Sequence, residues 1–452
     1  MALQRSLDST PVRQPVPFPT PVQPDTSATK APALLINERW EQLILRLGFI
    51  LTGAFVLNTA LQAWSEGQIG IHHTLVWAIF AEYALAFCLM TMGILSVGWL
   101  KRLAWLLPAG ILFVLIVAFY IKIQINLTVY GTDNIAFSHV AAERLLQGEN
   151  PYTIKDATLI QQTAERFGVP TTFITSTTDG KPLDNLMSWP AGSALVFVPA
   201  LWLGVTDLRW VVVAFQIAVL ALLWLRAPAA LRPLAVIVLA VDPYLLLYFT
   251  GGGVLDYIWV LPVLASAITL YQGRFNWSAA CYGLAAGIKQ QPWLLAPFLA
   301  IWVWQMHRER SVAARARAVG EFGAIALAGF LALNLPFMVW DFPAWLRGVL
   351  LPFNEQLVPF GSGISLLTQT GIADLPKGFY SAATFGVWGV LLLAYALHFR
   401  TLKHALWLAP AVIMWFSYRS LQNYFIYWTP MLIVALMSWW EEEQRAPATI
   451  ES

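Results

Sequence analysis

The sequence is poor in charged residues. Only 12% of its 452 residues are Asp, Glu, Lys or Arg, about half of the roughly 25% that is usual in soluble domains. Hydrophobic residues make up 58% of the chain. A soluble globule could not bury that much apolar surface, because even large domains leave much of their surface exposed. The shortage of charge therefore excludes a single soluble fold.

Three further features of the sequence exclude other classes of protein. Cys88 and Cys281 are the only cysteines, and both lie in apolar segments, so we expect neither a disulfide framework nor a cysteine metal site. The net charge is only +2, which gives no reason to expect nucleic-acid binding. Aromatic residues, at 14%, are too frequent for a disordered chain. We therefore expect an all-α, polytopic integral membrane protein.

Apolar stretches that approach or exceed the length needed to cross a bilayer recur along most of the chain. A span needs about 20 apolar residues, and on this basis we expect about 11 to 13 transmembrane helices. The stretches lie near residues 43–63, 73–97, 103–121, 190–204, 208–226, 233–249, 255–271, 277–306, 319–340, 378–397, 403–418 and 420–440.

The chain divides into four parts. Residues 1–38 are rich in proline and contain no apolar run, so we expect a disordered cytoplasmic tail. The first two spans form an additional transmembrane hairpin, residues 39–102. Residues 103–440 form the main transmembrane domain, and residues 441–452 form an acidic cytoplasmic tail.

Three short basic loops, 101–102, 307–317 and 400–404, set the expected topology. Cytoplasmic loops carry an excess of Lys and Arg, so these loops and the N-terminus should lie in the cytoplasm. The long connections 122–187 and 341–377 then lie outside. The second of them is rich in Phe, Leu, Pro and Gly, and we expect it to lie against the membrane.

The middle of the chain leaves two topologies open. Arg226 and Arg232 also favour the cytoplasmic side. This requires either that 190–204 dips into the membrane without crossing it or that 277–306 crosses it twice.

The connection 122–187 carries polar residues at the expected exterior surface. Asp133 follows the third span. Apolar residues at helical spacing over 136–147 predict a short amphipathic helix lying in the interface, which ends at Gly148. Asp133 could be an ordinary solvated acid, and the polar residues of the helix could form a solvated face. These residues are His139, Glu143 and Arg144.

Four motifs resemble polyprenyl-phosphate-sugar-dependent glycosyltransferases of the GT-C superfamily. After the Asp and the helix come "GENPY" at 148–152 and "SWPAGSALVFVPAL" at 188–201. "GLAAGIKQQPWLLAPF" at 283–298 and "FSYRSLQNYFIYW" at 416–428 are similar to later elements of the same family. The likeness is closest to the bacterial mannosyltransferase-like branch, and it begins at about residue 103.

The resemblance implies a GT-C-like fold with exterior amphipathic helices and a hexosyltransferase activity in the cell envelope. Such an enzyme moves a sugar, here with mannose favoured, from a polyprenyl-phosphate donor to a hydroxyl of a lipid- or glycan-linked acceptor. The reaction would occur at the exterior face of the plasma or inner membrane. No resident cofactor or nucleic-acid partner is expected, and a divalent metal stays open.

The same resemblance assigns roles to individual residues. Asp133 would take the proton of the acceptor hydroxyl as general base. Lys289 and Arg419 would bind the donor phosphate, because a leaving phosphate needs cationic or N–H donors. Lys289 could instead be a loop lysine that extends its head to the interface. The supporting candidates are Asn134, His139, Glu143, Arg144, Trp189 and Asp256.

Two other classes compete with a transferase. A secondary transporter would contain discontinuous helices, and helix breaks of that kind are indicated at Asp242–Pro243 and Lys289–Pro292. A non-catalytic scaffold or a partner of a lipid flippase is the third possibility. The sequence leaves open the sugar, the acceptor, the linkage and the oligomeric state.

Overall fold

The fold is all-α, as the composition predicts. The computed structural model describes residues 38–65, 73–95, 100–125, 129–170, 174, 177, 180, 183–235, 251–354 and 357–445, and it is 74% helical. Within these ranges one sheet is present, the parallel pair of β1 (Phe360–Gly361) and β2 (Arg419–Ser420). Most of the predicted tail 1–38, most of the predicted span 233–249 and residues 446–452 lie outside the described residues.

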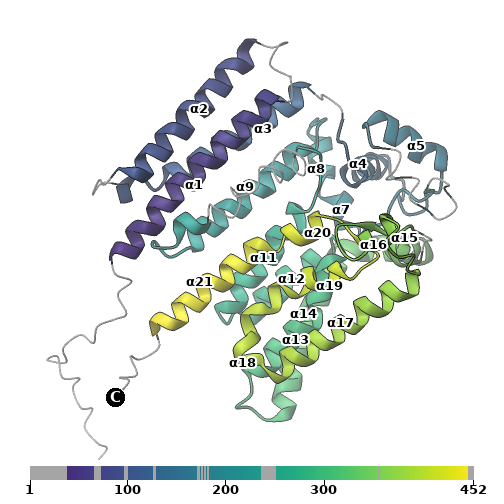
Figure 1. Cartoon of the computed structure of the whole chain (residues 1–452). Helices are drawn as coiled ribbons and strands as arrows, with labels where there is room; N and C mark the ends of the chain where they lie inside the picture. Colours follow the sequence, from purple (N-terminus) through teal and green to yellow (C-terminus); the bar gives the residue numbers. More distant parts are fainter. Residues whose placement is uncertain are drawn as a thin grey trace, which may run out of the picture.

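Six helices are long and apolar enough to cross a membrane, by length and composition, which indicates a membrane protein. In Figure 1 the long helices share one general direction, with the first three at one edge of the molecule. The six are α1 (Glu38–Ser65), α2 (His73–Ile94), α3 (Leu106–Ile125), α9 (Arg209–Arg226), α14 (Val312–Trp340) and α17 (Lys377–Leu397).

Apart from 233–249, the other predicted spans are shorter or broken helices. Proline lies at the first or second position of several of them, where its missing N–H is tolerated although it cannot continue a preceding helix. They are α7 (Gly192–Leu195), α8 (Val198–Trp202), α11 (Tyr257–Tyr271), α12 (Phe275–Ala286), η4 (Gln291–Leu295), α13 (Ala296–Met306), η5 (Lys403–Trp407), α19 (Ala409–Trp415), α20 (Asn423–Ile426) and α21 (Thr429–Arg445).

In the middle of the chain, 277–306 contains a helix hairpin and 190–204 lies at one end of the helical body. Helices α12 and α13 form a hairpin, because the ring of Phe275, at the start of α12, lies 5.4 Å from the ring of His307, just after α13. The segment 277–306 therefore runs through the helical body and back. Helices α7 and α8 pack against α4 (Asp133–Leu146), so the segment 190–204 stays at one end of the body.

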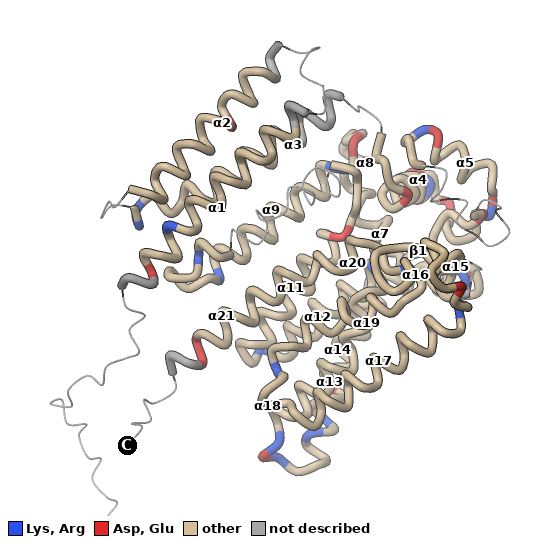
Figure 2. The backbone as a smooth tube through the Cα atoms, viewed as in Figure 1, with Lys and Arg blue, Asp and Glu red and all other residues tan. Residues whose placement is uncertain are grey.

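Charged residues gather at the two ends of the helices. Figure 2 shows long stretches without charge between these ends. At one end Lys101 pairs with Glu41 at 2.9 Å, and Arg226 pairs with Glu441 at 2.5 Å. The loops 307–309 and 398–403 line one cavity, so they share an end as well. Helix α18 (Phe399–Leu402) lies there, and α4 and α5 (Ala157–Arg166) lie at the other end (Figure 1).

The connection 341–377 is more ordered than a loop lying against the membrane. It forms α15 (Phe342–Asn354), β1 and α16 (Leu366–Gln369). Helix α15 buries Trp345 and Val349 but exposes Phe342, Leu346 and Phe353. An exposed row of large apolar side chains beside a long apolar helix still agrees with contact between this segment and lipid.

Glycine allows α12 and α14 to approach closely. A Cβ atom on Gly283 would lie 2.0 Å from the carbonyl oxygen of Ala326, and one on Gly329 would lie 2.8 Å from that of Ala280. Small residues at such crossings let helix backbones pack together in membrane proteins. This contact holds the α12–α13 hairpin against α14.

We expect Gly283→Ala to destabilise the protein by about 1–3 kcal/mol, because the added methyl group overlaps backbone atoms that cannot rotate away. The matched control is Gly323→Ala in α14, where an added Cβ meets nothing within 4 Å. That control should keep or slightly raise stability, since alanine favours helix. Thermal unfolding of both variants purified in detergent measures the difference, and equal melting temperatures would contradict the prediction.

Candidate functional site

Contacts with the start of α11 hold the first turn of α4. Gly131, at a φ of 72°, turns the chain, and Thr132 is the residue before the helix that begins with Asp133. The Thr132 hydroxyl donates a hydrogen bond to the carbonyl oxygen of Gly253 at 3.0 Å. The Asn134 side-chain oxygen accepts one from the amide of Leu255 at 3.3 Å. Asp133 is therefore positioned against the segment that precedes α11.

Helix α4 is buried and does not lie on a surface. Its residues from Asn134 to Ala142 are all buried, including His139 at 2% exposure. The expectation of an interfacial amphipathic helix with a solvated polar face is thus wrong for most of its length. The reason lies in the tertiary structure, because α5, α7 and α8 all pack against α4 and cover its polar side.

A chain of side chains accounts for His139 and Glu143. One hydrogen bond of 2.7 Å joins the Tyr130 hydroxyl to His139 Nδ1, and His139 Nε2 lies 3.2 Å from Glu143. Arg166 donates two hydrogen bonds of 2.8 Å to Glu143. Burial raises the pKa of Glu143, but the bonds from His139 and Arg166 outweigh it and hold that pKa at about 2. These residues fasten α4 to α5.

Arg144 has a similarly local role. It pairs with Glu149 at 3.0 Å in the turn that follows α4. Asp133 begins the helix and Arg144 lies in its last turn, so the two lie roughly 16 Å apart along the axis at 1.5 Å per residue. The structure therefore does not bring Glu143 or Arg144 to Asp133.

A buried ion pair lies at the centre of the site. Lys289, in the break after α12, lies 2.5 Å from Asp256, which precedes α11, and both side chains are only 1% exposed. Asp256 also accepts hydrogen bonds from the indole of Trp259 at 2.5 Å and from the amide of Asn423 at 2.6 Å. Lys289 is thus not a lysine that reaches the interface, and Asp256 belongs to the site.

Asp133, Arg419 and Lys289 lie close enough for their charges to act on one another. Asp133 is half-buried, and burial raises its pKa above the ordinary value of 3.8, while the positive charges of Arg419 and Lys289 lower it in part. The charges of Arg419, Asp256 and Asp133 all act on Tyr424 as well. The structure brings the three main predicted residues into one electrostatic cluster.

Arg419 is placed by the small sheet. It is the first residue of β2, and its partner in the parallel register is Phe360 of β1. The guanidinium carbon lies 5.7 Å from the centre of the Phe360 ring. Arg419 is half-buried. Strand β1, in the connection 341–377, thereby holds Arg419 where its charge acts on Asp133.

The sequence motifs meet in space. The Tyr152 hydroxyl, from 148–152, donates a hydrogen bond to the carbonyl oxygen of Trp189 at 2.7 Å. Gln290, beside Lys289, donates one to the carbonyl oxygen of Ser188 at 2.8 Å. Trp189 is half-buried, and this pairing uses its backbone. The contacts between the motifs therefore hold the segment between α12 and η4, which carries Lys289, against the segment around Trp189.

Asn334 is a structural residue that the sequence reasoning missed. It is fully buried in α14. Its side chain accepts a hydrogen bond from the amide of Ala191 at 2.9 Å and donates one to the carbonyl oxygen of Gly287 at 3.1 Å. A lone asparagine within an apolar helix was the available signal, since such groups are costly unless they have partners. Asn423, Tyr424 and Trp259 were missed as well.

In the described part of the chain, no group of three or more His, Cys, Asp or Glu side chains is placed to hold a metal ion. Comparisons with protein-family models, with curated proteins and with solved structures found no match to this chain. Functional inference therefore depends on the geometry of this site.

We expect Lys289→Met to cost about 3–5 kcal/mol of stability, because it leaves the buried Asp256 carboxylate without its cation. The double variant Asp256→Asn/Lys289→Met should lose less than the sum of the two single variants, since it removes both charges. Glu309→Gln, which breaks an exposed pair with Arg308, is the control and should have little effect. Additive losses in the thermal unfolding of these variants would contradict the interpretation of a coupled pair.

Proposed function

We propose that this protein is a membrane glycosyltransferase that moves a sugar from a polyprenyl-phosphate donor to an acceptor hydroxyl, with Asp133 as general base. The observation that carries the proposal is a half-buried carboxylate with a raised pKa beside the Arg419 cation. Mannose is the favoured sugar, and the acceptor is a hydroxyl of a lipid or a glycan. The Asp133 end would face the cell exterior, with the N-terminus in the cytoplasm.

The proposed reaction needs a base and a cation in one place. As the acceptor oxygen bonds to the anomeric carbon of the sugar, Asp133 takes the hydroxyl proton. The bond from the same carbon to the phosphate oxygen breaks, and the lipid phosphate leaves with the electron pair. A raised pKa brings the carboxylate closer to the operating pH, where a base is most effective. Arg419 would stabilise the charge that develops on the phosphate.

Lys289 takes a different place in this proposal from the one that the sequence suggested. Its ammonium group is buried against Asp256, so it acts on the site through its charge and by holding α11 to the break after α12. Arg419 is then the cation proposed to touch the donor phosphate. The prenyl chain would lie along the exposed apolar side of α15 and α16, which includes Phe353 and Leu366.

We expect Asp133→Asn to reduce sugar transfer by about 10²–10⁴-fold, because the amide cannot accept the acceptor proton. The assay incubates purified protein with labelled polyprenyl-phosphate mannose, glucose and arabinose and analyses the products. The matched control is Asp374→Asn, an exposed acid before α17, which should retain full activity.

Transfer retained by Asp133→Asn would reject the catalytic role of Asp133. Absence of transfer by the wild type from all three donors would reject the function as stated. Accumulation of a solute in sealed vesicles without consumption of donor would instead favour the transporter.

The pH profile of transfer provides an independent check. The base must be ionised, so the rate should fall as the pH drops through the raised pKa of Asp133, at a higher pH than for an ordinary aspartate. Arg419→Gln removes a charge that lowers this pKa and should move the acidic limb to still higher pH. Arg347→Gln in α15, an exposed arginine, is the control. If the acidic limb of the pH profile does not move in Arg419→Gln, the proposed electrostatic coupling between Arg419 and Asp133 is contradicted.

A further inference from the structure

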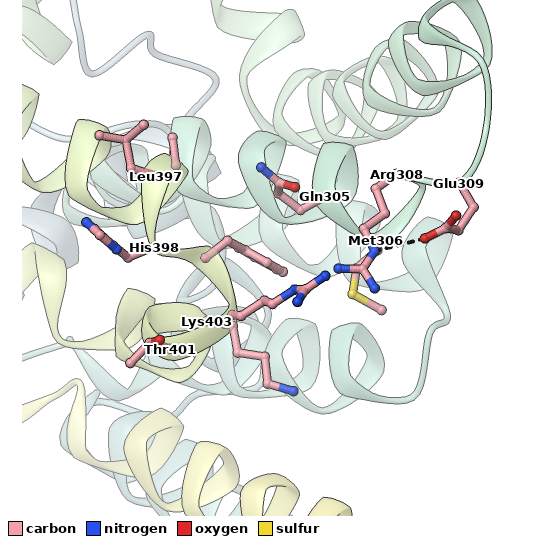
Figure 3. A pocket seen from close by; sticks show the side chains of 11 residues that line it. Gln305, Met306, Arg308, Glu309, Leu397, His398, Thr401 and Lys403 are labelled. Carbon is pink, nitrogen blue, oxygen red and sulfur yellow. Dashed lines mark hydrogen bonds and ion pairs between the residues drawn. The ribbon is translucent and has the colours of Figure 1, made fainter.

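A cavity lies at the end of the helices away from α4. Its volume is about 830 Å³, and it opens between the end of α13 and the turn from α17 to η5. Figure 3 shows Arg308 and Lys403 extending into the same space from these two segments, with Gln305 and Met306 beside them. The residues of the site around Asp133 take no part in its lining.

The lining of this cavity is rich in cations. Arg308, Arg400 and Lys403 face it, and Glu309 is its one acid. Arg308 pairs with Glu309 at 3.1 Å at an exposed position, where such a pair contributes little. Lys403 pairs with Glu442, which lies outside the lining. Among the described residues, no hydrogen bond or ion pair holds the exposed Arg400 side chain. Like charges in one cavity repel each other, and a bound anion would relieve that repulsion.

Capping of α13 does not account for Arg308. The carbonyl groups at a helix C-terminus attract cations, so this role has to be considered first. At the end of α13, however, His307 Nδ1 forms a 2.9 Å hydrogen bond with the carbonyl oxygen of Val303, and Arg315 donates one of 3.1 Å to that of Trp304. Arg308 bonds to neither, and its one ion pair is the exposed contact of its Nε with Glu309.

The lining of the cavity also contains exposed apolar side chains. Met306 and Leu397 belong to its lining and are 52% and 69% exposed. Leu397 is also the last residue of α17, one of the helices long and apolar enough to cross a membrane. If α17 crosses a bilayer, the cavity lies at the depth of the lipid headgroups. Its combination of cations and exposed apolar side chains matches a ligand that is both anionic and amphiphilic.

We propose that this cavity binds the phosphate headgroup of an anionic phospholipid. Arg308, Arg400 and Lys403 contact the phosphate, and Met306 and Leu397 contact the first carbons of the acyl chains. Basic pockets between transmembrane helices on the cytoplasmic side bind such headgroups. The site is separate from sugar transfer, and it would exist in a transporter as well.

The test measures lipid binding to the full-length protein in a non-ionic detergent by native mass spectrometry. Phosphatidylglycerol and phosphatidylcholine are titrated against the wild type and against Arg308→Gln/Arg400→Gln. The matched control is Arg310→Gln/Arg317→Gln, which removes the same charge from exposed positions of the adjoining segment outside the lining. Glycerol 3-phosphate is added as a soluble competitor.

Phosphatidylglycerol should bind the wild type more tightly than phosphatidylcholine does. The cavity variant should lose on the order of tenfold or more in affinity for phosphatidylglycerol, since each cation near the surface contributes about 1 kcal/mol. The control should change little, and glycerol 3-phosphate should fail to displace the lipid. Equal losses of phosphatidylglycerol affinity in both double variants, or equal binding of the two lipids by the wild type, would contradict the proposal that this cavity is the binding site. Competition by glycerol 3-phosphate as strong as by the lipid would overturn the lipid as its ligand.

Discussion

The buried ion pair between Asp256 and Lys289 joins parts of the chain that are far apart in sequence. Asp256 precedes α11, Lys289 follows α12, and Asn423 at the start of α20 donates to the same carboxylate. Taking two charges out of water is costly, and it is offset only when the remaining hydrogen-bonding positions are filled. Here Trp259 and Asn423 fill them. Because α4 begins against the segment beside Asp256, the position of Asp133 depends on this pair.

Helix breaks make this arrangement possible. A span that continued straight from 277 to 306 would carry Lys289 past Asp256, whereas the turn after Gly287 places it at the start of α11. Broken backbone inside a membrane protein needs partners for its polar groups. Asn334 supplies one for the carbonyl of Gly287, and Gln290 bonds to the carbonyls of Ser188 and Val349. The side chains that close the break thereby also fix the segment around Trp189 and Pro190.

Composition predicted the helical class, because this depends on local hydrophobicity. Of the 11 to 13 predicted spans, six described helices are long and apolar enough to cross a membrane. The bounds of the broken helices were not predictable in the same way, since they depend on which backbone groups find distant partners. Asp133, Lys289 and Arg419 stood out as scarce charges, and the structure brings them together. The pairing of Lys289 with Asp256 was missed because it requires the contact between α11 and α12. The burial of His139 was missed because α5 covers it, which no periodicity within α4 reveals.

The acidic end of α21 pairs with some, but not all, of the cations at the end of the helices where α18 lies. Glu441 neutralises Arg226, and Glu442 pairs with Lys403, so the carboxylates of this helix act on the side nearest α9 and η5. Arg308 and Arg400 pair with no carboxylate of α21 among the described residues. The positive charge that α21 leaves uncompensated at this end therefore lies at Arg308 and Arg400. In a bilayer of mixed lipids, anionic lipids would concentrate near these two arginines. The protein would then have a preferred orientation toward its lipid neighbours.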